Sequence, residues 1–200
     1  MLIAVLGKKR SGKDTFSDYI INKYGFIKYS FADPLKKGIQ CFFNLTDEQL
    51  NNQELKETVD PRWGVSPRRL FQVIGTDIFQ HSLQKFIPEL EIESRKHWVI
   101  LFKQWYEQYL NENKNKNENK NIKVIISDGR FLHEIEEIKK LGGKVIKIIR
   151  PVLNDNNNDD NHQSEIEIDT IPDTFIDYTI INDGSLNDFY NKIDDFILLL

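Results

Sequence analysis

Short apolar runs along the chain alternate with longer stretches in which apolar residues recur at helical spacing. Each short run closes on glycine, proline or polar residues, which is typical of buried strands in a parallel sheet. The pattern predicts five strands, at 1–6, 26–31, 122–126, 144–149 and 175–181. The amphipathic stretches predict helices, at 15–24, 35–43, 66–80, 93–110, 131–141 and 186–197. Strands that alternate with helices indicate an α/β fold, with a five-stranded parallel sheet covered by helices on both faces.

The first apolar run leads directly into a glycine-rich loop, Gly7-Lys-Lys-Arg-Ser-Gly-Lys-Asp-Thr15. A strand, the spacing Gly-x-x-x-x-Gly-Lys and a helix, in this order, form the pattern of a phosphate-binding loop. Gly7 permits a sharp turn, and Gly12 lets backbone amides approach a ligand beside the positive end of the helix. Lys13 supplies a mobile charge for the β- and γ-phosphates. The alternative is a tight turn whose charged residues are merely solvated.

Position 14 departs from the usual loop, which has a Ser or Thr there to bind Mg²⁺. This chain has Asp14, followed by Thr15. We therefore expect Asp14 to hold Mg²⁺ through a water, or the role of the hydroxyl to be met elsewhere.

Charged residues also follow three other predicted strands. Asp33 and Lys36 follow the second, Asp128 and Arg130 the third, and Arg150 the fourth. Ligands of open α/β sheets bind at the carboxyl ends of the strands. We therefore expect Asp33 and Lys36 to meet a second substrate, and Asp128 to orient Mg²⁺ or a catalytic water beside Arg130. The alternative for both aspartates is a helix N-cap.

Two adjacent arginines, Arg68 and Arg69, open the helix predicted at 66–80, where Ser66 can cap and Pro67 suits the first position. Cations are unfavourable at the positive end of a helix unless an anion sits between them. The pair therefore predicts an anion site, with solvated surface arginines as the alternative. Among nearby aromatic residues, Trp63 and Phe71 are both candidates to stack on a base.

Length and composition suit one domain, 1–200, with a helical region inserted at about 34–110. The segment 111–121 alternates Asn with Lys and Glu and predicts a flexible surface loop, and about 150–165 predicts a lid. The net charge of −4 gives no general basic surface for a nucleic-acid polymer. No apolar run is long enough to span a membrane, so we expect a cytoplasmic protein.

Several motifs together resemble the deoxynucleoside monophosphate kinases of phages and large DNA viruses. They are the glycine-rich loop, Phe31-Ala-Asp-Pro-Leu-Lys36, Pro67-Arg68 with Gln72-Val-Ile-Gly-Thr-Asp77, Ile126-Ser-Asp-Gly-Arg-Phe131, Gly142-Gly143 and His162-Gln-Ser-Glu165. The family usually has Asp-Val-Arg where this chain has Asp128-Gly129-Arg130. The resemblance implies the P-loop NTPase fold, a three-layer α/β/α arrangement with a five-stranded parallel sheet and a small lid.

The residue patterns and the resemblance together give candidate roles for individual residues. Lys9, Lys13, Asp128 and Arg130 are candidates for catalysis, and the resemblance places Lys9 between the two phosphates. Residues that would bind ATP are Gly7, Arg10, Ser11, Gly12, Lys13, Asp14, Thr15 and Arg150. Residues that would bind the acceptor are Lys9, Asp33, Leu35, Lys36, Trp63, Arg68, Arg69, Gln72, Ser164 and Glu165. Mg²⁺ would lie near Asp14 and Asp128, through water.

These observations lead to one expected reaction, the transfer of the γ-phosphoryl group of ATP to a deoxynucleoside 5′-monophosphate with Mg²⁺. A related kinase with another phosphorylated acceptor, such as phosphomevalonate or dephospho-coenzyme A, is the alternative. A nucleotide-binding switch without transfer is a third reading, although the chain has no Asn-Lys-x-Asp motif. The sequence leaves open the base, the sugar and the oligomeric state, for which a homodimer is a candidate.

Overall fold

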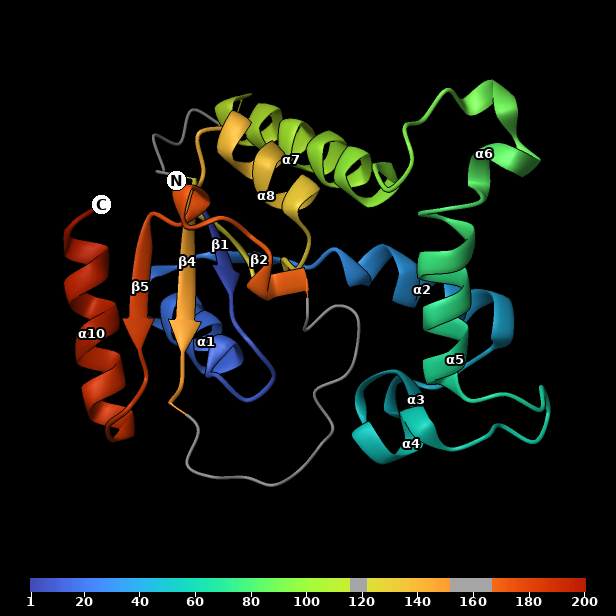
Figure 1. Ribbon diagram of the computed structural model, residues 1–200, viewed down its shortest axis with the longest axis horizontal. Coiled ribbons are helices and arrows are strands. Elements are labelled where there is room, and N and C mark those ends of the chain that lie inside the picture. The colour runs from blue at the N-terminus through green and yellow to red at the C-terminus, as the bar shows by residue number, and fades with distance from the viewer. Residues whose placement is uncertain (116–121, 152–166) are drawn as a thin grey trace. The chain divides into compact units, whose positions relative to one another are not determined.

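The computed structural model describes residues 1–115, 122–151 and 167–200 (Figure 1). The remainder includes residues 116–121, most of the predicted lid, and the predicted site residues Ser164 and Glu165, all of which lie outside the described residues. The chain divides into two compact units. We call residues 1–30 with 108–200 the sheet unit, and residues 31–107 the helical unit.

The sheet unit contains five parallel strands in the order β2-β3-β1-β4-β5. Their bounds are β1 Leu2–Leu6, β2 Ile27–Tyr29, β3 Val124–Ile126, β4 Lys144–Ile149 and β5 Tyr178–Ile181. The central strand β1 pairs with β3 through Ile3 and Ile125, and with β4 through Ala4 and Val145. The predicted five-stranded parallel sheet is therefore confirmed.

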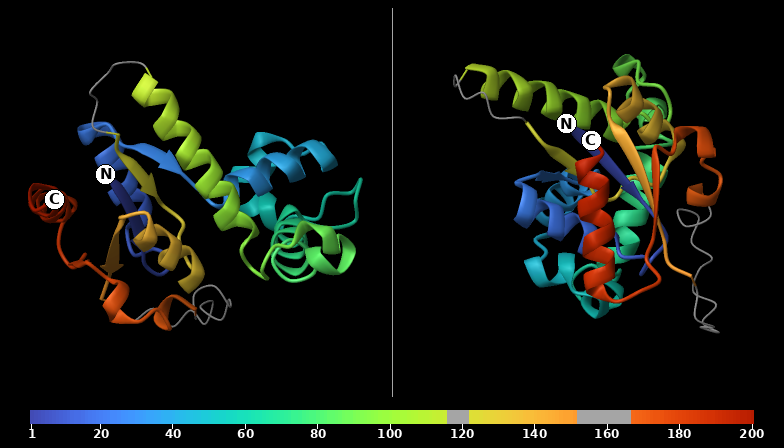
Figure 2. Two further views of the ribbon diagram at one scale, coloured as in Figure 1. Left: turned by 90° about the horizontal axis from the view of Figure 1, so that it is seen from above. Right: turned by 90° about the vertical axis from the view of Figure 1, so that its left-hand side faces the viewer.

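Alternate side chains of β1 face opposite layers of helices, as the period of a strand requires. Ile3 and Val5 join the core formed by α1 (Lys13–Tyr24) and α10 (Leu186–Leu198). On the other face, α8 (Leu132–Lys140) packs against β1 and β4. Figures 1 and 2 show α1 and α8 on opposite sides of the sheet. The three-layer arrangement expected from the sequence is thus present.

A polar cluster fastens α1 to α10. The carboxylate of Asp194 accepts hydrogen bonds from Tyr19 Oη (2.9 Å), Tyr24 Oη (2.7 Å) and Lys23 Nζ (2.6 Å). The ring of Tyr19 stacks on that of Tyr190, with 4.1 Å between centroids. These contacts hold the C-terminal half of α1 against α10.

The helical unit consists of short helices around a small apolar core. Their bounds are α2 Ala32–Phe43, α3 Asp47–Asn51, α4 Gln53–Glu57, α5 Pro67–Gln72 and α6 Leu83–Phe86 (Figure 1). A π-helical turn, Val73–Ile78, continues α5, and α7, His97–Asn115, spans the boundary between the units. Single-turn 3₁₀ segments lie at Pro88–Leu90 and Asp173–Phe175. Ile39, Leu45 and Leu50 form the buried core of this unit.

Two predicted elements differ from the structure. The helix predicted at 66–80 changes to a π-helical turn after Gln72. The flexible loop predicted from residue 111 is wrong for 111–115, which continue α7. Hydrogen bonds between residues four apart sustain this polar end, from Gln108 to Glu112 (2.7 Å) and from Asn113 to the carbonyl of Tyr109 (2.7 Å). None of the helices in the described part combines the length and apolar character that a membrane span needs.

Candidate functional site

The glycine-rich loop leaves the carboxyl end of β1 and enters α1 in the conformation of an anion-binding loop. Gly7 has a φ of 155°, Arg10 of 65° and Gly12 of 110°. A Cβ at Gly7 would lie 2.7 Å from the carbonyl oxygen of Ile148, so only glycine fits there. No side chain of the described residues caps the first turn of α1. The positive end of that helix therefore favours an anion.

Lys13 closes the loop. Its ammonium group donates hydrogen bonds to the carbonyl oxygens of Gly7 (2.5 Å) and Lys8 (2.7 Å). Lys8 itself pairs with Asp169 (2.7 Å). The hydroxyl of Ser11 is buried and has no hydrogen-bond partner within the described part of the chain. Lys9, Arg10 and Asp14 are exposed, whereas Thr15 is half-buried.

Asn182, directly after β5, holds the loop from behind. Its side-chain amide donates to the carbonyl oxygen of Ser11 (3.0 Å), and its backbone N–H donates to the carbonyl oxygen of Ile149 (2.7 Å). A Cβ at Gly12 would lie 2.7 Å from this amide nitrogen and 3.3 Å from the ring of Phe189. Because a trans peptide is planar, a Ser11 carbonyl fixed toward Asn182 directs the Gly12 N–H the opposite way. Asn182 thereby orients an amide of the phosphate-binding loop.

Asp128 and Arg130 follow β3, the neighbour of β1, at the same edge of the sheet. Ser30 Oγ donates to the carboxylate of Asp128 (2.6 Å). Asp128 does not cap the next helix, because α8 begins at Leu132 with Phe131 at the N-cap. Arg150 follows β4 at this edge and is exposed. The sheet unit therefore gathers the loop, Asp128, Arg130 and Arg150 along its carboxyl edge.

A buried carboxylate holds the turn that carries Arg130. Glu134 is 3% exposed and accepts hydrogen bonds from the backbone N–H groups of Arg130 (2.8 Å) and Phe131 (3.1 Å). Burial raises the pKa of Glu134 to about 8 against the opposing effect of these two bonds, and the charge of Asp128 adds to the rise.

In the helical unit, a second group of cations includes predicted acceptor residues. Arg68 Nε donates to Glu57 Oε1 (2.8 Å), so Arg68 is ion-paired rather than merely solvated. Half-buried Lys36 lies on α2, and Lys56 lies on α4. The pKa of Lys56 is lowered, first by burial and then by the positive charges of Lys36 and Arg68. Lys56 therefore lies within the electric field of both Lys36 and Arg68.

The remaining predicted acceptor residues lie at varied positions of the same unit. Trp63 is 46% exposed, and its indole N–H donates to the carbonyl oxygen of Phe43 (2.9 Å). Leu35 packs beneath the π-helical turn, where a Cβ at Gly75 would lie 2.5 Å from Leu35 Cδ2. Asp33 is exposed in the first turn of α2 rather than at its N-cap. Arg69 is exposed and Gln72 is half-buried on α5.

The described residues contain no group of three or more His, Cys, Asp or Glu side chains that would form a metal cage. Mg²⁺ commonly keeps several waters and binds proteins through one or two carboxylates together with substrate phosphates. A half-buried Asp128 and an exposed Asp14 at the loop suit that mode of binding.

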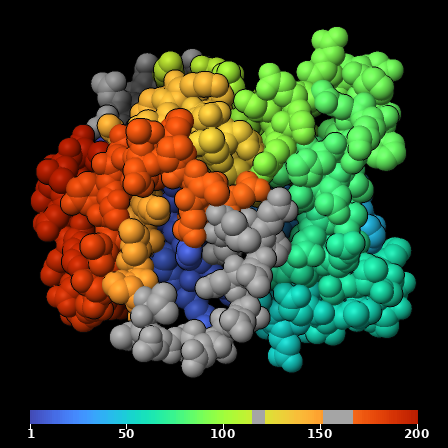
Figure 3. Space-filling view, viewed as in Figure 1, coloured from blue at the N-terminus to red at the C-terminus, as the bar shows by residue number. Residues whose placement is uncertain are grey.

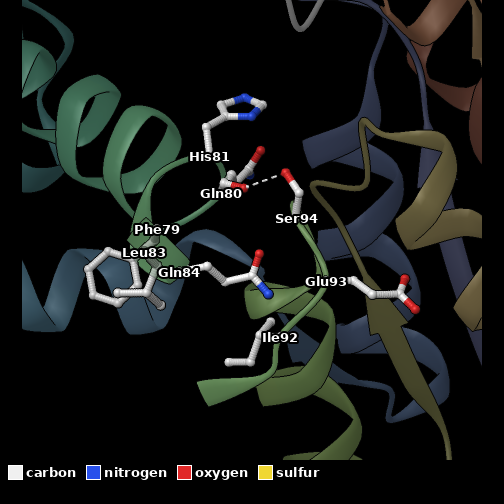
Figure 4. A pocket seen from close by; sticks show the side chains of 8 residues that line it. All are labelled: Phe79, Gln80, His81, Leu83, Gln84, Ile92, Glu93 and Ser94. Carbon is white, nitrogen blue, oxygen red and sulfur yellow. Dashed lines mark hydrogen bonds between the residues drawn. The ribbon is translucent and has the colours of Figure 1, made fainter. Parts of the chain in front are cut away.

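A separate small pocket lies in the helical unit beside Gln80, His81 and Ser94 (Figure 4). Ser94 Oγ donates to the backbone carbonyl of Gln80 (3.1 Å), and the side-chain oxygen of Gln80 is buried without a partner among the described residues. The pocket has room for roughly one water molecule. We therefore assign it no substrate. Figure 3 shows a different part of the surface, where the start of the chain, coloured blue, is exposed beside orange residues.

Sequence reasoning missed three residues that contact or lie near candidate site residues, namely Asn182, Glu134 and Lys56. An asparagine after the last strand could have signalled Asn182, because that strand ends at the ligand-binding edge. Glu134, three residues after Phe131, occupies the position at which an acidic side chain can bond the N-cap amide. Nothing in the sequence singles out Lys56 from the surrounding polar residues.

Comparison with known proteins finds relatives whose descriptions agree with one another. The sequence profile of the family described as deoxynucleotide monophosphate kinase matches residues 1–60 and 48–193. A mimivirus protein (Acanthamoeba polyphaga mimivirus) with the same description is 40% identical over 195 residues, which cover 96% of this chain and 94% of the relative. The deoxynucleotide monophosphate kinase of Enterobacteria phage T4 is 25% identical, with coverage of 100% of this chain and 99% of the relative.

Solved structures are similar in fold. Dephospho-CoA kinase from Campylobacter jejuni gives a TM-score of 0.51 at 20% identity, covering 98% of this chain and 95% of that one. Shikimate kinase from Aquifex aeolicus gives 0.50 at 15% identity, covering 99% and 96%. At such identities the likeness bears on the fold alone, and the fold is that of P-loop kinases.

Proposed function

The chain belongs to the deoxynucleotide monophosphate kinase family and is a nucleotide kinase, and from this premise we propose that it transfers the γ-phosphoryl group of ATP to a deoxynucleoside 5′-monophosphate. The products are ADP and the deoxynucleoside diphosphate. The observation that carries the proposal is the glycine-rich loop closed by Lys13, whose ammonium group bonds to the carbonyls of Gly7 and Lys8.

The triphosphate of ATP binds this loop. Backbone amides between Gly7 and Thr15, the positive end of α1 and the Lys13 ammonium group surround the β- and γ-phosphates. The buried hydroxyl of Ser11 gains a partner there. Arg10 and Arg150 complete the ATP site, the latter at the base of the predicted lid.

The acceptor monophosphate binds the cations of the helical unit, Lys36 and Arg68, with Arg69 and Gln72 beside them. Asp33, Leu35 and Trp63 contribute to the sugar and base site, and Ser164 and Glu165 stay acceptor-binding candidates on the sequence resemblance alone. This assignment makes residues 34–110 the acceptor-binding region.

The reaction needs no side-chain nucleophile. An acceptor phosphate oxygen, already anionic, forms a bond to the γ-phosphorus while the bond from that phosphorus to the β-phosphate oxygen breaks. Lys9, Lys13 and Arg130 neutralise the charge that develops on the transferred group, so catalysis rests on positioning and electrostatics. Asp128 and Asp14 would hold Mg²⁺ through water, and the ion when bound neutralises charge on the β- and γ-phosphates.

Substitution of Lys13 tests the proposal. Lys13→Ala should lower the rate of ADP production with deoxynucleoside monophosphates by about 10³-fold or more, the cost of one lost transition-state cation. Lys140→Ala is the matched control, because Lys140 is exposed on α8 and its nearest carboxylate oxygen is 3.7 Å away. An unchanged rate in Lys13→Ala would contradict the site.

A panel of acceptors tests the substrate class. The wild-type protein should turn over at least one of the four common deoxynucleoside monophosphates in the presence of ATP and Mg²⁺. Turnover of phosphomevalonate or dephospho-coenzyme A, with none of the deoxynucleotides accepted, would contradict the proposed acceptor.

A further inference from the structure

Three cations on three helices of the helical unit carry more positive charge than the structure neutralises. Lys36 lies on α2, Lys56 on α4 and Arg68 on α5, and α5 packs against both other helices. Burial is the main cause that lowers the pKa of Lys56; the positive charges of Lys36 and Arg68 lower it further, and the charge of Glu57 opposes them. Within the described residues, Lys36 and Lys56 form no ion pair. Glu57 pairs with Arg68, with 2.8 Å between Oε1 and Nε.

Such a surplus is unfavourable in the free protein. Like charges in a partly desolvated place repel, and removing water from an ammonium group adds a further cost. Three cations with one carboxylate leave a net charge of about +2, which is opposite in sign and similar in size to the charge of a phosphate monoester near neutral pH. Sites that accept such a cost are commonly functional sites.

We propose that Lys56 is a third cation of the acceptor-phosphate site, together with Lys36 and Arg68, and that the carboxylate of Glu57 holds Arg68 until the phosphate displaces it. The inference rests on the proposed function, because the ligand it assigns is the 5′-phosphate of the acceptor. It adds a residue that no sequence motif of the chain contains, and it gives the Glu57–Arg68 pair a role in the free protein.

A purely structural role for Lys56 makes the opposite prediction for stability. The stem of a half-buried lysine can cover apolar surface while its charge stays in water. Were this its role, loss of the ammonium group would leave acceptor binding unchanged. In the proposed site, Lys56→Met keeps an apolar stem of similar length and removes a repulsive charge, so stability should not fall.

The experiment measures acceptor binding by titration calorimetry without ATP, steady-state KM values and thermal unfolding. For Lys56→Met we expect Kd and KM for the deoxynucleoside monophosphate to rise at least about tenfold, the loss typical of a hydrogen bond between charged partners. KM for ATP should stay within about twofold, and the unfolding midpoint should stay level or rise. Lys85→Met, at an exposed position of α6, is the matched control and should change none of these quantities.

A second variant tests the part played by Glu57. Glu57→Gln removes the competing carboxylate, so KM for the acceptor should fall by about 1.5- to 5-fold, as expected for one exposed ion pair. An acceptor Kd within about twofold of wild type in Lys56→Met, or a lowered unfolding midpoint with unchanged binding, would overturn the inference and leave the proposed function standing. A wild-type protein that neither binds nor turns over a deoxynucleoside monophosphate would overturn both.

Discussion

Asn182 shows how one side chain can set the direction of a backbone amide in the phosphate-binding loop. Its amide fixes the Ser11 carbonyl at 3.0 Å, which orients the next peptide N–H. Asn182→Ala should therefore raise KM for ATP by about 2- to 10-fold, since a hydrogen bond between neutral groups contributes about 0.5–1.5 kcal/mol net. KM for the acceptor should change little. Steady-state kinetics with each substrate varied in turn provide the measurement.

Asn187→Ala is the appropriate comparison, because Asn187 is exposed on α10, five residues further along the chain. An Asn182→Ala protein with a normal KM for ATP would show that the loop keeps its shape without this bond.

Glu134 makes the stability of the protein depend on pH. Its pKa is about 8 in the folded protein, against an ordinary value of 4.5, so the folded state binds the proton more tightly. Stability from this group is fully present below about pH 4.5 and is lost as the pH rises toward 8. Each unit of pKa difference corresponds to about 1.4 kcal/mol, so the loss amounts to a few kcal/mol.

Glu134→Gln removes this dependence, because an amide cannot ionise while its oxygen can still accept from Arg130 and Phe131. We expect the free energy of unfolding of the variant, relative to wild type, to increase between pH 5 and pH 8.5 in denaturant titrations. Glu136→Gln is the matched control on the same helix. If the free energy of unfolding changed with pH in the same way for Glu134→Gln and wild type, the raised pKa of Glu134 would be contradicted.

At the scale of elements, the π-helical turn after α5 is hydrogen-bonded to a tryptophan of another helix. The backbone N–H groups of Phe79 and Gln80 donate to the carbonyls of Ile74 and Thr76, on either side of Gly75. The skipped Gly75 carbonyl accepts from Trp98 Nε1 on α7 (3.1 Å), in a buried position. Trp98→Phe should therefore cost about 1–3 kcal/mol in the free energy of unfolding, the penalty of an unsatisfied buried carbonyl.

Trp63→Phe serves as the comparison in the same denaturant titration. Its indole also donates to a backbone carbonyl, of Phe43, but in an exposed position where water can replace it. Its cost should be smaller, at about 1 kcal/mol or less. Equal losses of unfolding free energy in the two variants would show that burial of the Gly75 carbonyl does not determine the cost of losing its hydrogen bond.

The same turn illustrates what the sequence can and cannot predict about elements. The helix predicted at 66–80 follows from local spacing, but the change to π geometry occurs around Gly75, where Leu35 packs and Trp98 donates a hydrogen bond from other elements. Residues 111–115 look like a loop because they lack apolar residues, yet side-chain bonds four residues apart continue α7. The strands, defined by dense apolar runs, were predicted to within a few residues.

The candidate-site residues also fall into two classes, those that the sequence alone reveals and those that only the fold reveals. The glycine-rich loop can be recognised because its chemistry is contained in nine consecutive residues, 7–15. Asn182, Glu134 and Lys56 act through partners that only the folded chain brings near: Ser11, the Arg130 turn, and Arg68 with Lys36. Residues of this kind require the fold before their role can be inferred.

At the scale of the whole molecule, the two proposed substrates bind chiefly to different compact units. The ATP loop belongs to the sheet unit, and the cations Lys36, Lys56 and Arg68 belong to the helical unit. Hydrogen exchange followed by mass spectrometry can separate the two sites, because ligands slow the exchange of the amides that they order. A non-hydrolysable ATP analogue alone should protect residues 7–15 and the start of α1.

A deoxynucleoside monophosphate alone should instead protect α4 and the first turn of α5, where Lys56 and Arg68 lie. Protection confined to the sheet unit would place the acceptor outside the helical unit and would contradict the proposal that the two substrates bind different units. Each compact unit has its own apolar core, so we expect each ligand to bind its own unit without the other ligand. We therefore expect the two substrates to bind in random order. Double-reciprocal plots of the initial rate, with both substrates varied, should show intersecting lines, as for a sequential mechanism. Product inhibition should follow the pattern of random binding.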